Sequence, residues 1–435
     1  RICGNIIDSP GLGEIRIRFG ILSYNDLGII EDITCTSATT FEILCQELGI
    51  KDIYSIQVLE KNEFLIPGFV DTHIHAPQYT YMGSATDEPL MTWLHKYTFP
   101  AESKFQSTEH ARVVYKKLVN DLLKHGTTTA LFFATIHLES TKVLADICHT
   151  AGQRAFVGKV CMDRNSPEFY IETTESSLQD TEAFINYVNQ LEGNLIQPVV
   201  TPRFIPTCSM DLMKGLGALS NKYDVLVQSH CSESDDEVNF SKSLHPTHLN
   251  DSAIFEECGL LKKKCVMAHC TRLSDDEFEI FKRLECSISH CSLSNAYFGD
   301  AILDVQRCIK EGVCVSLGTD IAGGPSPSLL NSMRTSVIAS RLRSQFYREL
   351  PINYKTAFHL ATMGGAKALC VDHKIGSFEV GKELDALRIR VGDTADPVPI
   401  FEGDSIEIMF EKFVNLGDDR NIICSIVKGK VVHKK

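Results

Sequence analysis

Eight short apolar runs, separated by charged stretches of helical character, constrain the fold of this chain more than any other feature. The runs are 65–75, 127–135, 155–163, 196–204, 224–232, 264–270, 286–291 and 314–320. A helix over 108–124 can begin at Ser107 or Thr108, and Ser274-Asp-Asp-Glu277 is typical of a capping box. Strands that alternate with helices form parallel sheets, and eight of them can close into a barrel. The sequence therefore predicts an α/β fold with a (β/α)8 TIM-like barrel.

The two ends of the chain differ in character from the region between them. Residues 1–65 lack strong helical periodicity, and 15–19 alternates like a half-exposed strand. Residues 374–435 are again rich in strand and turn patterns. We expect these two segments to pair into one small β-sandwich domain, with the barrel of residues 66–373 inserted between them. A chain of 435 residues is long enough for one large and one smaller domain.

The charge and hydrophobicity of the chain exclude several kinds of partner. The formal net charge is -13 and no long Lys/Arg-rich run offsets it, which argues against nucleic acid or an anionic membrane. No run of about 18 apolar residues would span a bilayer, and residues 1–4 lack a signal-peptide pattern. We therefore expect a cytoplasmic protein. The chain begins with Arg1 rather than Met, which leaves open whether residues precede it.

Sixteen cysteines are many for a protein of this length, and their context decides how they are interpreted. Cys161, Cys265, Cys286 and Cys314 lie in apolar runs, where a free cysteine behaves as a small buried hydrophobe. There is no Cys-x-x-Cys pair, and the chain is far longer than a disulfide-rich scaffold. Reduced thiols in a cytosolic protein are the favoured interpretation.

Residues able to bind a metal gather at the ends of the predicted strands. His73 and His75 end the first run, and alternate residues of a strand face the same side, so both imidazoles can share one ion. An isolated His-x-His motif is as often two ordinary histidines. However, His230, His269 and Asp320 end the fifth, sixth and eighth runs. Because the carboxyl ends of barrel strands share one face, this placement predicts a metal site.

The types of ligand limit which metal fits. Imidazoles with one carboxylate suit Zn²⁺, with Fe²⁺ as the less favoured alternative. Three histidines, one aspartate and a water leave an open catalytic position, and bound Zn²⁺ lowers the pKa of its water to about 7. No lysine lies where a carbamylated bridge between two metals is expected. We therefore expect one Zn²⁺ per subunit.

Proton transfer needs further groups beside the metal. Glu233 lies three residues after His230 and suits a general acid/base that takes a proton from water and delivers it to substrate. The ordinary alternative for Glu233 is a solvated acid in a loop. Asp320 can accept a hydrogen bond from the water, and His269 can orient the water or stabilise developing charge.

Five motifs resemble those of the amidohydrolase superfamily of metal-dependent hydrolases. They are Pro-Gly-Phe-Val-Asp-Thr-His-Ile-His at 67–75, His-Cys-Ser-Glu at 230–233, Met-Ala-His at 267–269, Ser-His-Cys at 289–291 and Leu-Gly-Thr-Asp at 317–320. Stretches 97–102 and 152–163 resemble the guanine deaminases within that superfamily. The resemblance spans nearly the whole chain and is weakest before residue 60.

The resemblance implies hydrolytic deamination of guanine to xanthine and ammonia, a step of guanine catabolism, by a homodimer. It implies that zinc is held by His73, His75, His230 and Asp320, and that Glu233 shuttles protons with help from His269 and Asp320. It implies that Gln78, Trp93, Arg203, Phe204, His230 and Glu233 bind the substrate. Arginine suits this role because its rigid fork of donors matches a carbonyl and a ring nitrogen.

Three alternatives are weighed against this interpretation. One is a deaminase or dechlorinase acting on another purine, a pyrimidine or a triazine; another is a non-catalytic scaffold, whose members typically lose metal ligands. A cytidine-type zinc deaminase is excluded, since His137-Leu-Glu139 is followed by no Pro-Cys-x-x-Cys. The loop His290-Cys-Ser-Leu-Ser-Asn295 departs from the family pattern, because Ser292 stands where proline is expected. The shape of that loop stays open.

Overall fold

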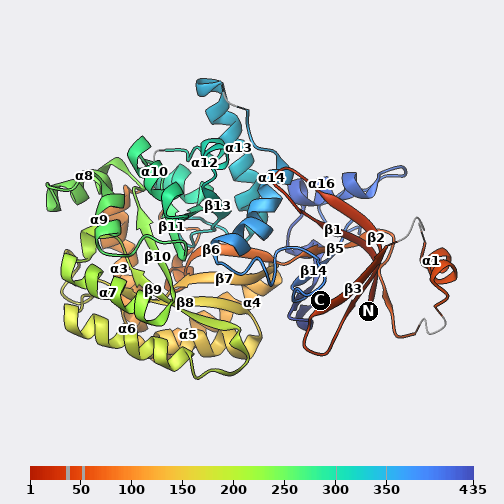
Figure 1. Ribbon diagram of the computed structural model, residues 1–435, viewed down its shortest axis with the longest axis horizontal. Coiled ribbons are helices and arrows are strands. Elements are labelled where there is room, and N and C mark those ends of the chain that lie inside the picture. The colour runs from red at the N-terminus through yellow and green to blue at the C-terminus, as the bar shows by residue number, and fades with distance from the viewer. Residues whose placement is uncertain (36–39, 51–53, 300, 349) are drawn as a thin grey trace.

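A computed structural model describes residues 1–35, 40–50, 54–299, 301–348 and 350–435. Within these residues, eight parallel strands follow one another in chain order to form the barrel, with helices packed around it (Figure 1). The strands are β6 (Phe69–His75), β7 (Thr127–Phe133), β8 (Arg154–Cys161), β9 (Ile196–Pro202), β10 (Leu226–Cys231), β11 (Cys265–His269), β12 (Ser287–His290) and β13 (Cys314–Leu317). The predicted fold class is confirmed.

The helices follow the predicted alternation. They are α1 (Phe41–Leu48), α2 (Leu90–Trp93), α3 (Phe99–Ser103), α4 (Thr108–Lys124), α5 (Leu138–Ala151), α6 (Thr174–Val188), α7 (Met210–Tyr223), α8 (Asp235–Leu244), α9 (Asp251–Glu257), α10 (Asp275–Arg283), α11 (Ser292–Ser294), α12 (Val305–Glu311), α13 (Leu329–Tyr347), α14 (Tyr354–His359), α15 (Gly365–Ala368) and α16 (Ile406–Leu416). Ser107 caps α4, because its side chain accepts a hydrogen bond from the His110 amide. Ser274 and Glu277 form the predicted capping box of α10. No helix among the described residues is long and apolar enough to cross a membrane.

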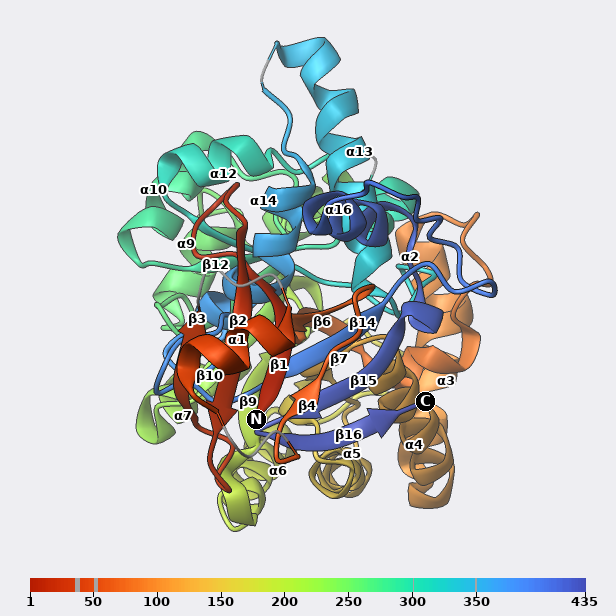
Figure 2. The ribbon, with the colours of Figure 1, turned by 90° about the vertical axis from the view of Figure 1, so that its right-hand side faces the viewer.

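The two ends of the chain meet in a second sheet beside the barrel (Figure 2). Its strands are β1 (Ile2–Asp8), β2 (Arg16–Tyr24), β3 (Ile30–Cys35), β4 (Gln57–Val58), β5 (Glu63–Pro67), β14 (Ala386–Arg390), β15 (Ile422–Val427) and β16 (Lys430–Lys434). The N-terminal and C-terminal parts join where β5 pairs antiparallel with β14. The buried Glu63 carboxylate accepts hydrogen bonds from Arg388 and Arg390 on β14. The domain boundaries at residues 65 and 373 stay a prediction.

The first apolar run, 65–75, is not a single strand. It divides at Gly68 into β5 of the small sheet and β6 of the barrel. A side chain at Gly68 would put its Cβ only 2.0 Å from the Thr128 hydroxyl oxygen, so glycine allows the close approach of the two strands here. The chain can therefore pass from one sheet to the other without a loop.

The amino-terminal half of the barrel is filled with apolar side chains. One buried cluster takes a residue from each of six consecutive strands, namely Val70, Leu131, Phe156, Val199, Leu226 and Val266. Ala366 and Ala368 of α15 also belong to this cluster, as do Leu369 and Ile375. Because this half of the interior is packed with apolar groups, polar side chains inside the barrel can gather only at the carboxyl ends of the strands. Barrel enzymes have their active sites at that end.

A buried ion pair joins the barrel to the small domain. Arg154, at the start of β8, donates from Nε to Asp385 over 3.0 Å and from Nη2 to Glu383 over 2.6 Å. Its side chain is 5% exposed and that of Asp385 only 2%. Removing one partner of such a pair leaves a buried charge uncompensated.

We predict that Arg154→Met lowers the free energy of unfolding by about 3 kcal/mol, because Asp385 and Glu383 lose their counter-charge. Urea denaturation followed by circular dichroism measures the change. Lys263→Met is the control: its ion pair with Glu285 lies in solvent, with the two side chains 72% and 64% exposed, and we expect little change. Equal midpoints for the two variants would contradict the prediction.

Candidate active site

A cavity at the carboxyl ends of the barrel strands holds about 430 Å³ of empty space, which includes solvent at its open mouth. Nine of the residues singled out in the sequence line it: His75, Gln78, Trp93, Arg203, Phe204, His230, Glu233, His269 and Asp320. The tenth, His73, is buried beside the same cluster. The fold thus brings together residues spread over more than 240 positions of the chain.

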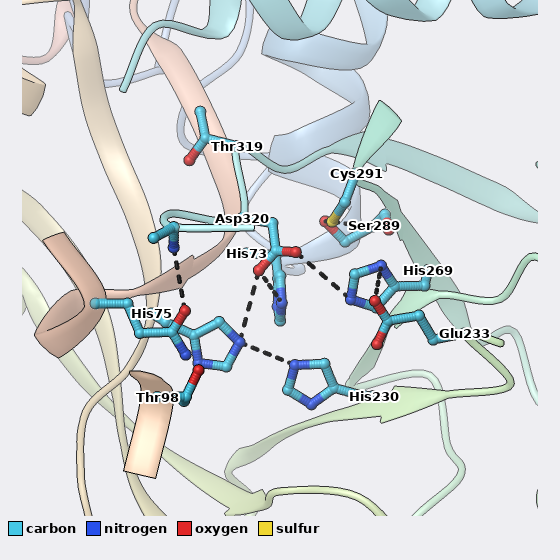
Figure 3. Close-up of polar contacts among 12 residues, drawn as sticks. His73, His75, Thr98, His230, Glu233, His269, Ser289, Cys291, Thr319 and Asp320 are labelled. Carbon is cyan, nitrogen blue, oxygen red and sulfur yellow. Dashed lines mark hydrogen bonds and ion pairs between the residues drawn. The ribbon is translucent and has the colours of Figure 1, made fainter. Parts of the chain in front are cut away.

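Three histidines and an aspartate converge at the floor of this cavity (Figure 3). The Nε2 atoms of His75 and His230 are 2.9 Å apart, and Asp320 Oδ1 lies 3.1 Å from His73 Nε2. His73 Nε2 is buried, and its contact with Asp320 lacks hydrogen-bond geometry. A buried nitrogen without a hydrogen bond, facing other imidazoles and a carboxylate, fits a metal ion. The cluster can therefore hold a metal.

The protonation of these groups suits metal binding. Burial lowers the pKa of His75 and of His230 well below the usual range, so both rings stay neutral, which is the form that binds metals. His230 Nδ1 donates to the backbone oxygen of Arg203 over 2.6 Å, leaving the Nε2 lone pair free toward the cluster. Burial alone would raise the pKa of Asp320, but His73 beside it holds that pKa well below its usual range. Asp320 is therefore a carboxylate.

The backbone turns sharply where the strands deliver these side chains. Ser232, His269 and Asp320 have φ values of 49°, 69° and 51°, in the left-handed region that non-glycine residues rarely adopt. Each such residue costs about 1–3 kcal/mol, and they tend to cluster at functional sites. Three such residues at or just after the ends of three strands fit a functional role for this end of the barrel.

The carboxylate of Asp71 joins the first and last barrel strands beneath the cluster. Its Oδ1 accepts from the backbone amides of His73 and Thr319, and its Oδ2 accepts from the Thr319 hydroxyl over 2.6 Å. The Asp320 amide donates to the His73 carbonyl over 2.9 Å. Burial raises the pKa of Asp71 to about 7. These bonds fix His73 and Asp320 relative to each other.

Glu233 lies beside the cluster and outside its ligand atoms (Figure 3). The side chain is buried, so it is not a solvated acid in a loop. Burial raises its pKa, and Oε1 lies 3.6 Å from His269 Nδ1. The Glu233 amide donates to Glu237 Oε2 over 2.8 Å, which fixes the loop. A raised pKa in a cavity suits a group that both takes and gives a proton.

The loop after β12 supplies residues that were not singled out in the sequence. Asn295 Oδ1 accepts a hydrogen bond from His269 Nδ1 over 2.8 Å, and Ser294 lines the cavity. Both residues belong to the motif His290-Cys-Ser-Leu-Ser-Asn295, so the family pattern could have indicated them as site residues. Ser292 donates to the Ser332 carbonyl of α13 over 3.1 Å, which ties down the loop where proline is expected.

Aromatic side chains form the outer wall of the cavity. Trp93 from α2 packs against Phe298, with ring centroids 4.9 Å apart, and Phe204 follows β9. All three rings are buried, as expected for the binding of a flat heterocycle. Phe298 was not singled out in the sequence, because it lies three residues beyond the motif that ends at Asn295, in the short helix Asn295–Gly299.

The polar wall depends on a residue that the sequence did not single out. Gln78 and Arg203 line the cavity, and both donate to the carboxylate of Glu102, which lies behind them. Glu102 is fully buried. It lies within 97–102, one of the stretches behind the family resemblance, but nothing in its spacing indicated a place at the site.

Comparisons with known proteins agree with this geometry. Residues 64–432 match the model of the amidohydrolase family. The chain belongs to the amidohydrolase family. It is 44% identical to a guanine deaminase of Mus musculus, over 96% of this chain and 92% of that protein, and 41% identical to one of Dictyostelium discoideum, over 99% and 97%. A solved guanine deaminase from C. acetobutylicum with bound guanine superposes with a TM-score of 0.90 and 34% identity, covering 99% of each chain.

We predict that Asp71→Asn weakens the affinity for Zn²⁺ by about 10- to 100-fold, because an amide nitrogen then faces donors and loosens the junction between His73 and Asp320. Competition with a metal-sensitive dye measures the affinity. Asp163→Asn is the control, since Asp163 accepts from Ser209 and Thr174 at a distance from the cluster. Wild-type affinity in Asp71→Asn would show that the junction does not fix the ligands.

Proposed function

We propose that this protein deaminates guanine to xanthine and ammonia by hydrolysis. The observation that carries the proposal is the convergence of a metal-competent cluster, a buried acid and a cavity with polar and aromatic walls at one end of the barrel. Guanine deaminases that cover nearly the whole chain at up to 44% identity support it, as does the related structure with bound guanine.

The proposed metal is a single Zn²⁺, held by His73, His75, His230 and Asp320. The donor set of imidazoles and one carboxylate supports zinc. When bound, zinc lowers the pKa of a water to about 7 and so supplies a nucleophile at neutral pH. A metal ion binds imidazole in its neutral form and aspartate in its deprotonated form. The ligands already have these forms, so binding requires no change of protonation.

Glu233 is the proposed proton carrier. It takes one proton from the attacking water and delivers it to a ring nitrogen of the purine. It then takes the second proton from the added hydroxyl and delivers it to the amino group, which leaves as ammonia while the new carbonyl forms. The raised pKa suits both steps, since a group with a pKa nearer neutrality accepts and donates a proton with similar ease. His269, held by Asn295, orients the water together with Asp320.

The walls of the cavity are proposed to hold the base. Trp93, Phe204 and Phe298 pack against the faces of the purine, and Gln78 and Arg203 hydrogen-bond its edge. A base fixed in this way presents one carbon to the cluster, which turns a bimolecular attack into a step between oriented groups.

We predict that the zinc-loaded protein converts guanine to xanthine with release of one ammonia, and that Glu233→Gln slows this by about 10²- to 10⁴-fold while zinc content is retained. The amide keeps the shape of the side chain but cannot carry the proton. Loss of guanine absorbance, ammonia release and metal analysis measure the three quantities.

Asp236→Asn is the matched control, because Asp236 is an exposed acid three residues away. It should leave turnover unchanged. Absence of guanine turnover by zinc-loaded wild-type protein would refute the proposed function. Turnover by Glu233→Gln at the wild-type rate would refute only the proposed role of Glu233.

The protein is proposed to act as a cytosolic homodimer, with no nucleic acid or membrane as partner. All sixteen cysteines are free thiols, which supports a reducing compartment. The end of α13 projects from the body of the molecule (Figures 1 and 2) and exposes Ile338, Leu342 and Phe346. These residues lie four apart and so share one helical face, which supports packing against a second copy.

We predict that Phe346→Glu, which places a charge in this apolar face, converts a dimer into a monomer. Sedimentation equilibrium at micromolar concentration measures the mass. Val113→Glu is the control, because Val113 is also an exposed apolar residue but lies on α4, away from α13. A Phe346→Glu protein of dimeric mass would exclude α13 as the interface.

A further inference from the structure

One buried carboxylate organises the polar wall of the cavity from behind. Glu102 accepts from Arg203 at both oxygens, over 2.6 and 3.2 Å, from Gln78 Nε2 over 3.0 Å and from the Tyr170 hydroxyl over 2.9 Å. Glu102 has no exposed surface and does not line the cavity. All four contacts are with donors, so its oxygens are occupied by the protein and not by a ligand.

The three partners of Glu102 are held as donors. Burial and Glu102 raise the pKa of Tyr170 well above the usual range, so its hydroxyl keeps its proton. Burial alone would lower the pKa of Arg203, but Glu102 raises it. Arg203 has five N–H groups and donates two to Glu102, so others remain for the cavity.

The amide of Gln78 is fixed in one orientation. Its Nε2 donates to Glu102, and its Oε1 accepts from the Ala322 amide over 3.1 Å. A flipped amide would set its oxygen against the Glu102 carboxylate and its NH₂ against an N–H. The remaining N–H of Gln78 is therefore a fixed donor beside Arg203.

We propose that Glu102 sets the hydrogen-bonding polarity of this wall and thereby selects a 6-oxopurine over a 6-aminopurine. Glu102 is a positioning and specificity residue that acts through Gln78 and Arg203. The inference rests on the proposed function and deepens it, because it concerns the class of base that the same cavity admits.

The chemistry of the two classes of base differs at one edge. Guanine presents two adjacent acceptors, O6 and N7, which match a wall of donors. A 6-amino group replaces O6 by a donor, so an N–H of the ligand would face an N–H of Gln78 or Arg203. Because both wall residues are buried, neither group could turn to water for a partner.

The test compares guanine with 2,6-diaminopurine, which keeps the 2-amino group, replaces O6 by an amino group and loses the proton on N1. We expect zinc-loaded wild-type protein to have a kcat/KM at least about 10-fold higher for guanine. Glu102→Gln should reduce this ratio at least about 10-fold, because the new amide nitrogen lets Gln78 flip and present its oxygen. An unchanged ratio in folded, zinc-loaded Glu102→Gln would overturn the inference.

Glu172→Gln is the matched control. Glu172 lies between β8 and α6 with its side chain 8% exposed, paired with Lys159 Nζ over 2.5 Å, and neither residue lines the cavity. We expect it to lose stability and keep the wild-type ratio. A ratio that falls as far in Glu172→Gln as in Glu102→Gln would show a general effect of buried charge and overturn the inference.

A binding measurement separates this inference from the proposed function and needs no variant. Hypoxanthine and adenine both lack the 2-amino group and differ at the 6-position and in the proton on N1. Calorimetry on zinc-loaded wild-type protein should show hypoxanthine bound at least about 10-fold more tightly than adenine. That result without guanine turnover would support the donor wall and refute the proposed function. Tighter binding of adenine would overturn the inference, whatever the turnover.

Discussion

The junction between the first and last barrel strands is the constraint on which the rest of the site depends. Sheet pairing runs from β6 to β13 in order, and backbone hydrogen bonds of Asp320 and His75 close the ring at the carboxyl end. Asp71 adds two hydrogen bonds to this closure, both from Thr319. Because His73 and Asp320 lie on opposite sides of the junction, the closure of the barrel and the assembly of the metal-competent cluster are one event. In a barrel that stayed open at this junction, the ligand atoms of His73 and His75 would lie apart from those of Asp320.

The two halves of the barrel divide stability from chemistry. The apolar cluster from six strands fills the amino-terminal half and supplies the favourable burial. The carboxyl half contains left-handed residues, buried acids and neutral histidines, all of which cost free energy. Strain of this kind persists only where the surroundings over-determine it. Short strands that end at fixed points on a packed floor provide such surroundings.

The sequence predicted what depends on periodicity and on motifs, and it missed what depends on contacts between distant segments. The eight strands, the bounds of α4 and the capping box of α10 followed from local patterns. The convergence of His75, His230 and Asp320 followed from the rule that barrel strands end on one face. The division of 65–75 at Gly68 was missed, because a continuous apolar run has the same sequence pattern whether it forms one strand or two. Glu102 was missed because its partners lie up to about 100 residues away.

Glu102 also shows why such residues escape a search based on ligand chemistry. It touches neither the cavity nor the metal-competent cluster, yet it fixes which atoms of Gln78 and Arg203 face a ligand. An amide side chain is ambiguous by itself, because rotation by 180° exchanges donor and acceptor. A carboxylate behind it removes that ambiguity at the cost of one buried charge, which Arg203 neutralises. Recognition in this cavity therefore depends on Glu102 together with Gln78 and Arg203. Gln78 and Arg203 face the ligand, but Glu102, which the ligand does not reach, determines which of their atoms donate hydrogen bonds.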